Sequence, residues 1–174
     1  KAVTIKDPQP FNSNGGNGLL VCSKGAIKVN SLTATYNGTT GVWLANTAGW
    51  AQGIYQPVTV SGYNLFDHNI GGSGKGLWIM SHGAITVSNI TATNNSNDGV
   101  LLDNCIQIDF AYDSALPDCQ ARLAKPVTVS GTNVFLGRAY SYFNTTNIVP
   151  PTLETWTLST AGRFTKLDGV TLPT

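Results

Sequence analysis

The sequence predicts an all-β solenoid in which short strands stack in successive coils, and two observations lead to this fold class. The segment "HGAITVSNITATNNSNDGVLLDN" at residues 82–104 nearly repeats "KGAIKVNSLTATYNGTTGVWLAN" at residues 24–46, 58 residues earlier. Within both copies apolar and polar residues alternate with the period of two that is typical of strands, and no helical period runs through them. Tandem units this short cannot bury a core alone, so they are expected to stack.

Each predicted coil begins with a similar strand. The sequence "PVTVSG" occurs at residues 57–62 and again at residues 126–131, and related strands start at Ala2, Ala26 and Ala84. A polar turn rich in Asn and Gly follows, and then a second strand opened by glycine, as in "GVWLAN". This repeated order of strand, turn and strand predicts that each copy contributes layers to one stack.

The unit "ITVSNITATNNSNDGVLLDN" resembles the parallel β-helix repeat of pectate-lyase-like and bacterial surface proteins, and the resemblance covers residues 2–143. It implies a right-handed parallel β-helix of about five coils, with equivalent residues in columns about 4.8 Å apart. The resemblance is specific for the fold and not for an activity. The residues expected to point inward are Val58, Val60, Ile85, Val87, Val127 and Val129.

The chain is expected to form a β-helix domain at residues 1–149, with an insertion at residues 104–125, and a β extension at residues 150–174. Pro150 and Pro151 cannot continue a strand ladder and mark the boundary. Two strand-like runs follow, at residues 155–159 and 169–172. The extension is predicted to pack on the coils or on a neighbouring subunit. Its expected contact residues are Trp156, Leu158, Phe164, Val170 and Leu172.

Alternation along the second strand of each coil predicts an apolar stripe on the outside. The stripe consists of Leu20, Trp43, Trp78 and Leu101, with Met80 in the neighbouring column. An exposed stripe of this kind indicates a cover or a ligand. Three interpretations stay open: the extension or another subunit covers it, sugars stack on the tryptophans, or the orientation is inverted and the tryptophans lie in the core.

The first strands predict a second outward column, of Thr4, Lys28, Thr59, Thr86 and Thr128. Threonine rows of this kind resemble those of ice-binding solenoids, although Lys28 interrupts the row. The simpler interpretation is a solvated face with high β propensity.

Asparagines in the turns have two expected roles. Asn37 and Asn95 share a turn position, which predicts either an amide ladder or ordinary turn chemistry. Four asparagines also begin glycosylation triplets, and the turn positions of Asn37 and Asn94 predict that these two are accessible. The four are Asn37, Asn89, Asn94 and Asn144.

Cysteine usage bears on the compartment. Cys105 and Cys119 lie at the two ends of the insertion, and a disulfide between them would stabilise the fold by roughly 3 kcal/mol and indicate an oxidising compartment. The alternative is two thiols in a reduced protein. Cys22 is expected to be an apolar packing residue. No cluster of Cys, His or carboxylates occurs, so the sequence predicts neither a metal site nor a cofactor.

No catalytic site is predicted. The nearest candidate is "FDHN" at residues 66–69, where Asp67 and His68 form a possible dyad with Lys75 nearby in sequence, and an exposed turn is the alternative. The motifs of pectin-degrading enzymes are absent. Charged residues make up 11% of the chain and the net charge is +1, so a nucleic-acid partner is not expected. No apolar run is long enough to span a membrane.

These observations favour a secreted or surface-displayed structural protein, a building block of a fibre, filament or adhesin. No capping element precedes the first coil, which predicts either a piece of a larger surface protein or head-to-tail association of copies through the coil ends and the extension. The alternative from another class is a carbohydrate-binding or polysaccharide-degrading β-helix. Ice binding on the threonine face is a weaker alternative.

Overall fold

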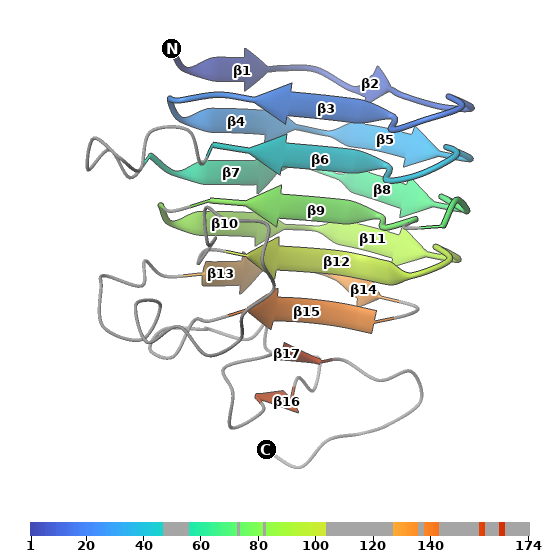
Figure 1. The fold of residues 1–174 in the computed structure, drawn as a ribbon. Helices are drawn as coiled ribbons and strands as arrows, with labels where there is room; N and C mark the ends of the chain where they lie inside the picture. The colour runs from blue at the N-terminus through green and yellow to red at the C-terminus, as the bar shows by residue number, and fades with distance from the viewer. Residues whose placement is uncertain are drawn as a thin grey trace, which may run out of the picture.

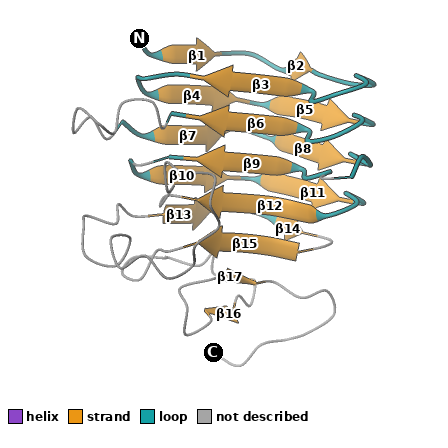
Figure 2. Cartoon of the chain, in the orientation of Figure 1, coloured by secondary structure: helices purple, strands orange, loops and turns teal. Residues whose placement is uncertain are grey.

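The computed structural model describes residues 1–46, 56–72, 74–81, 83–103, 127–135 and 138–142, together with residues 157–158 and 164–165. All of the regular secondary structure in these residues is β-strand, and the strands are joined by loops and turns (Figure 2). In this part of the chain there is no helix long and apolar enough to cross a membrane.

Fifteen of the strands form three five-stranded parallel sheets. Within each sheet the strands of successive coils follow one another along one axis (Figure 1). Sheet A consists of β1 (Val3–Ile5), β4 (Ile27–Asn30), β7 (Val58–Ser61), β10 (Ile85–Ser88) and β13 (Val127–Ser130). Sheet B consists of β2 (Gln9–Pro10), β5 (Leu32–Thr35), β8 (Asn64–Asp67), β11 (Ile90–Thr93) and β14 (Val134–Phe135). Sheet C consists of β3 (Leu19–Cys22), β6 (Val42–Ala45), β9 (Leu77–Met80), β12 (Asp98–Asp103) and β15 (Arg138–Tyr142).

Three consecutive strands, one from each sheet, make one coil, and the coils are numbered 1 to 5 from the N-terminus. The predicted all-β parallel solenoid is therefore confirmed. Each strand pairs with the equivalent strands of the coils before and after it, as when Ile85 of β10 lies between Val58 of β7 and Val127 of β13. Equivalent residues thus form columns, as the repeat predicts.

The core is a column of apolar side chains enclosed by the three sheets. The six residues predicted to point inward are at most 3% exposed. The threonines of the same strands lie in register on the outside, with Thr86 between Thr59 and Thr128. Burial of one face of every strand accounts for the alternation seen in the sequence.

The corner between sheets A and B turns at one left-handed residue in every coil. The φ angles are between 52° and 74° for Asp7, Ser31, Gly62, Asn89 and Gly131. Glycine, asparagine, aspartate and serine are suited to this conformation because they are small or bond locally to the backbone. At Gly62 a Cβ would also come close to Ser31 Oγ and Asn30 Oδ1 of the preceding coil, so a larger residue there would require these side chains to move.

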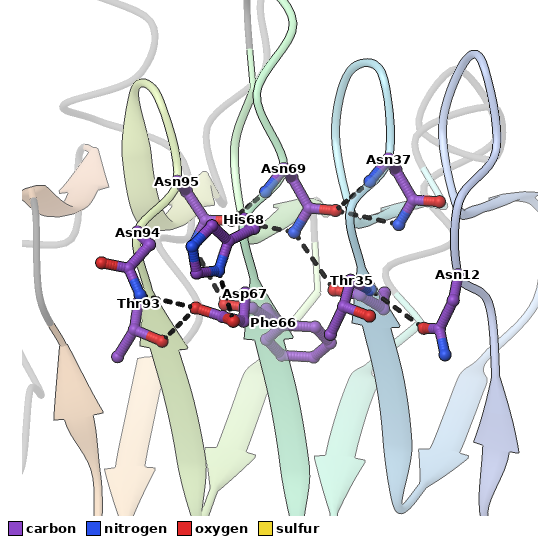
Figure 3. Close-up of polar contacts among 11 residues, drawn as sticks. Asn12, Thr35, Asn37, Phe66, Asp67, His68, Asn69, Thr93, Asn94 and Asn95 are labelled. Carbon is purple, nitrogen blue, oxygen red and sulfur yellow. Dashed lines mark hydrogen bonds and ion pairs between the residues drawn. The ribbon is translucent and has the colours of Figure 1, made fainter.

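A ladder of asparagine side chains crosses the turn between sheets B and C (Figure 3). Asn37 Nδ2 donates to Asn69 Oδ1 at 2.8 Å, and Asn69 Nδ2 donates to Asn95 Oδ1 at 2.8 Å. The predicted ladder is confirmed, but Asn69 of coil 3 lies between the two predicted members. Asn14 of coil 1 extends it, because Asn14 Nδ2 donates to Asn37 Oδ1 at 3.0 Å.

Large and small residues alternate from coil to coil in one inward column of sheet B. Phe66 is opposite Ala34 on one side and Ala92 on the other, and all three are fully buried. Phe135 is opposite Ala92. Phe11 donates its N–H to Thr33 O, which sets it opposite Ala34. Coils 1, 3 and 5 are therefore phenylalanine coils and coils 2 and 4 are alanine coils, which explains why the sequence repeats every two coils.

Part of the C-terminal extension forms a short antiparallel hairpin of β16 (Thr157–Leu158) and β17 (Phe164–Thr165). β17 lies beside β15, at the C-terminal end of the stack (Figure 1). Leu158 is opposite Phe164 in this hairpin. The other expected contact residues, Trp156, Val170 and Leu172, lie outside the described residues. Packing of the extension on the coils or on another subunit stays a prediction.

Candidate functional site

The predicted apolar stripe is a column on the outside of sheet C. Leu20, Trp43, Trp78 and Leu101 are opposite one another on β3, β6, β9 and β12. The residues flanking each tryptophan in its strand are fully buried, so both indoles point away from the core and the inverted orientation is wrong. The two indole rings stack with centroids 4.5 Å apart and planes 8° apart.

The stripe is open at the end of coil 1 and closed toward coil 4. Leu20 is 50% exposed, whereas Leu101 is 8% exposed. Trp43 and Trp78 are both half-buried. The predicted neighbour Met80 takes part, because Trp43 Nε1–H donates to Met80 Sδ at 3.2 Å. Tryptophan, methionine and leucine therefore hold one another in place on this face.

The stacking leaves little aromatic face for a ligand. Each indole covers one face of the other, and Lys75 Nζ lies 5.0 Å from the Trp78 ring centroid. Lys75 is held there by Asp98 Oδ2 at 3.8 Å. Trp78 Nε1 is buried and has no hydrogen-bond partner in the described part of the chain. Among the described residues, the face of Trp43 toward Leu20 is the one left for a sugar ring, so the stack is better suited to holding coils 2 and 3 together.

Asp67 and His68 form a second cluster, at the end of β8 (Figure 3). His68 Nδ1 lies 2.6 Å from Asp67 Oδ2. Asp67 Oδ1 accepts from Thr93 Oγ1 at 2.5 Å and from Asn94 Nδ2 at 3.0 Å. The His68 ring also stacks on Tyr36 of the preceding coil, with centroids 4.9 Å apart. The cluster thus joins coils 2, 3 and 4.

The contacts of Asp67 are those of a structural carboxylate. Burial raises its pKa, but the hydrogen bonds from Thr93, His68 and Asn94 and the charge of His68 lower the pKa below the ordinary value. A general acid needs a raised pKa, and glycoside hydrolysis needs two carboxyl groups on either side of the bond. The three side chains that contact Asp67 contain no carboxyl group, and Lys75 pairs with Asp98 instead.

The glycosylation candidates differ in accessibility. Asn37 is fully buried in the ladder, so the prediction that it is an accessible acceptor is wrong. Its local sequence is that of a surface turn, but its Oδ1 and Nδ2 both form hydrogen bonds with neighbouring coils. Asn94 is exposed, and Asn89 is half-buried with its Oδ1 accepting from Thr132 N–H at 3.0 Å. Asn144 lies outside the described residues.

Of the three cysteines, Cys22 lies in the part of the chain that the structure describes. Cys22 is exposed on β3 opposite Ala45, so the prediction that it is a packing residue is wrong in this part of the chain. Its position is equivalent to Met80, but coil 1 has no preceding coil to cover it among the described residues. Cys105 and Cys119 lie outside those residues, and their disulfide stays a prediction. No group of three or more His, Cys, Asp or Glu in the described ranges could hold a metal ion.

The N-terminal edge of the stack is the most distinctive remaining surface. Among the described strands, β1, β2 and β3 each pair with one neighbour in their sheets, as do β13, β14 and β15 at the opposite end of the stack. Four inward residues of coil 1 are only partly buried against the core, whereas Val21 of the same coil is buried. The four are Val3, Ile5, Phe11 and Leu19. An edge with unpaired backbone groups and partly exposed core residues can accept one further strand on each of the three sheets.

Comparison with known proteins adds no candidate activity, since no family model, curated protein or solved structure matches the chain. Three surfaces thus come from the geometry alone: the tryptophan stripe, the Asp67 cluster and the N-terminal edge. The first two have their polar and aromatic groups largely occupied by contacts between coils. In the described residues, the N-terminal edge combines strands that pair on one side with partly exposed core residues.

Proposed function

We propose that this chain is a structural segment of an extracellular β-solenoid, a rod within a surface fibre or adhesin, which is lengthened by coils that add at its N-terminal edge. The observation that carries the proposal is the state of coil 1. Its strands pair on one side only in the described part of the chain, and four of its inward apolar side chains are only partly buried.

The other features of the molecule support a structural role. Contacts between coils occupy the side chains of the Asn37–Asn69–Asn95 ladder and the stacked tryptophans. The chain has few charged residues, and its outer columns are rich in threonine and serine. The extracellular location rests on this composition and on the predicted disulfide between Cys105 and Cys119.

The test is to block the edge with a charge. In Val3→Lys an inward-facing ammonium group would lie between coil 1 and any coil added to it. Natural edge strands use inward-pointing charges of this kind to prevent pairing. Thr4→Lys is the matched control, because it adds the same charge to the same strand at an exposed position. Light scattering over a range of concentrations and negative-stain electron microscopy would report the mass and shape of the particles.

We expect the unmodified chain and Thr4→Lys to associate into elongated particles as concentration rises, and Val3→Lys to stay monomeric. Circular dichroism would confirm that all three chains are folded. If the unmodified chain stayed monomeric at every concentration, as Val3→Lys is expected to do, the result would contradict association through this edge.

Carbohydrate binding is the second candidate, because the Trp43 face toward the half-exposed Leu20 is apolar and lies on the outside of sheet C. It predicts that Trp43→Ala abolishes binding in a glycan screen while Leu101→Ala, at the covered end of the stripe, does not. Ice binding has the in-register row of Thr59, Thr86 and Thr128 in its favour and the interruption by Lys28 against it. Neither surface has the unused bonding capacity of the N-terminal edge.

A further inference from the structure

Coil 1 carries the features of a phenylalanine coil throughout sheet B. From Thr4 to Asn14 it has the same spacing as coil 3 from Thr59 to Asn69, with Phe11 equivalent to Phe66. Both coils have a left-handed residue at the same corner, Asp7 in one and Gly62 in the other. Phe66 has an alanine on each side in the stack, but Phe11 has an alanine on one side only, that of Ala34.

A second column alternates in phase with the first. Phenylalanine coils have an amide side chain at the first position of sheet B, and alanine coils have Leu32 or Ile90 there. Asn64 Oδ1 accepts the N–H of Leu32 in the preceding coil at 3.0 Å, and Asn133 Oδ1 accepts the N–H of Ile90 at 2.9 Å. Each amide therefore bonds to the backbone of the alanine coil that precedes it.

Coil 1 has an amide at this position too, since Gln9 is opposite Leu32. Gln9 is exposed and belongs to β2, an edge strand of sheet B in the described residues. An alanine coil added before coil 1 would bring a backbone N–H to the Gln9 carbonyl and an alanine to the open side of Phe11. Both columns thus specify the same kind of neighbour.

We propose that the N-terminal edge is a docking surface for one kind of partner, an alanine coil of the same repeat with the pattern Leu/Ile-Thr-Ala-Thr, and that it discriminates against phenylalanine coils. This inference rests on the proposed function, and it names the partner of that edge. The last coil of the chain has Phe135 at the position in question. Coil 5 is itself a phenylalanine coil, so coil 5 of a second copy is a weaker neighbour for coil 1 than an alanine coil, and association of copies through these ends needs a higher concentration.

The test is to supply a coil of each type to the complete chain. A duplicate of residues 26–56 replaces Lys1. The Gln56 of the duplicate then precedes Ala2, just as the original Gln56 precedes Pro57. The matched chain carries Ala34→Phe in the duplicate only. A third chain combines that change with Phe11→Ala, which restores the alternation with the residues exchanged. Phe11→Ala without an extension serves as the control for folding.

Hydrogen exchange at Thr4 is the readout. Val3 donates its N–H to Ala26 O, and alternation along the strand turns the Thr4 N–H toward the open side. We expect the alanine duplicate to slow exchange at Thr4 at least tenfold and to raise the melting temperature. The duplicate with Ala34→Phe should give much less protection and a smaller rise in melting temperature, because a phenylalanine coil is a weaker neighbour and not an excluded one, and the exchanged pair should regain the full protection.

Two other outcomes separate the inference from the function on which it rests. Equal protection of Thr4 by the alanine and phenylalanine duplicates would overturn the discrimination, while leaving the edge as a site where coils add. No protection by any of the three duplicates would overturn the addition of coils at this edge and the discrimination with it.

Discussion

At the scale of single residues, Asp67 shows how a polar side chain on the outside of the stack joins several coils. It lies at the end of β8 in coil 3 and accepts hydrogen bonds from Thr93 and Asn94 of coil 4, while His68 beside it stacks on Tyr36 of coil 2. These partners favour its ionised form, so its pKa in the folded chain is lowered, although burial alone would raise it. The charge on Asp67 is therefore linked to folding.

This linkage predicts a pH dependence. Because the pKa of Asp67 is lower in the folded chain than in the unfolded chain, its carboxylate stabilises the fold above the ordinary pKa, and the contribution is lost as pH falls through the lower folded value. Urea unfolding should show that the unmodified chain loses more stability between about pH 5 and about pH 2.5 than Asp67→Asn does. Equal losses would show that the Asp67 charge does not contribute. Asp7→Asn is the control, as an exposed aspartate at a corner.

At the scale of elements, the asparagine ladder holds the turn between sheets B and C in register. Asn69 Oδ1 accepts the backbone N–H of Asn37 at 3.2 Å as well as its side-chain amide. Asn69 Nδ2 donates to Ala34 O at 3.1 Å and to Asn95. Asn69 is fully buried, so each of these groups would lose its partner without access to water if the side chain were removed.

Asn69→Ala is therefore expected to destabilise the fold by about 3 kcal/mol or more, since each buried polar group left without a partner costs about 1–3 kcal/mol. Asn94→Gly is the matched control one coil away, because the side chain there is exposed and makes one hydrogen bond to Asp67, and glycine accepts the φ of 52° at this position. Its effect should be below about 1 kcal/mol. Chemical denaturation measures both. Similar effects of the two changes would mean that the ladder does not hold the turn.

The strand columns could be predicted from the sequence because alternation and the repeat both specify them. The stacked Trp43 and Trp78 follow from the same alignment. Asn69 was missed because the two long copies align coil 2 with coil 4 and pass over coil 3, which differs in loop length. The burial of Asn37 was also missed, since a turn asparagine has the same local sequence whether its amide faces water or a neighbouring coil.

At the scale of the whole molecule, the alternation of phenylalanine and alanine coils makes the packing of each coil depend on both neighbours. Its sequence signal was available, because Phe11, Phe66 and Phe135 each follow the left-handed corner residue by four positions. The signal has meaning only once the register sets these residues opposite Ala34 and Ala92. The packing of the core therefore depends on the order of large and small residues along the axis, and not on the volume of any one coil.

This dependence predicts that a substitution that conserves volume will fail. Ala34→Phe combined with Phe66→Ala keeps the composition of the core, and exchanges that conserve volume usually cost less than about 1.5 kcal/mol. Here the new phenylalanine of coil 2 would lie against Phe11, and two alanines would meet between coils 3 and 4. We expect the pair to destabilise the fold at least as much as Phe66→Ala alone, about 3–5 kcal/mol.

The matched control exchanges two residues in a column of sheet A where valine and isoleucine alternate, so that the two side chains exchanged differ by only one methylene group. Val58 and Ile85 are opposite each other in sheet A and both are fully buried. Val58→Ile combined with Ile85→Val should therefore cost below about 1.5 kcal/mol, because the neighbouring residues in that column are also valine or isoleucine. Urea denaturation of the two exchanged pairs gives the comparison directly. If the phenylalanine–alanine exchange were tolerated as well as the valine–isoleucine exchange, the core would adapt to coils in any order. The N-terminal edge would then have no basis in packing for preferring an alanine coil.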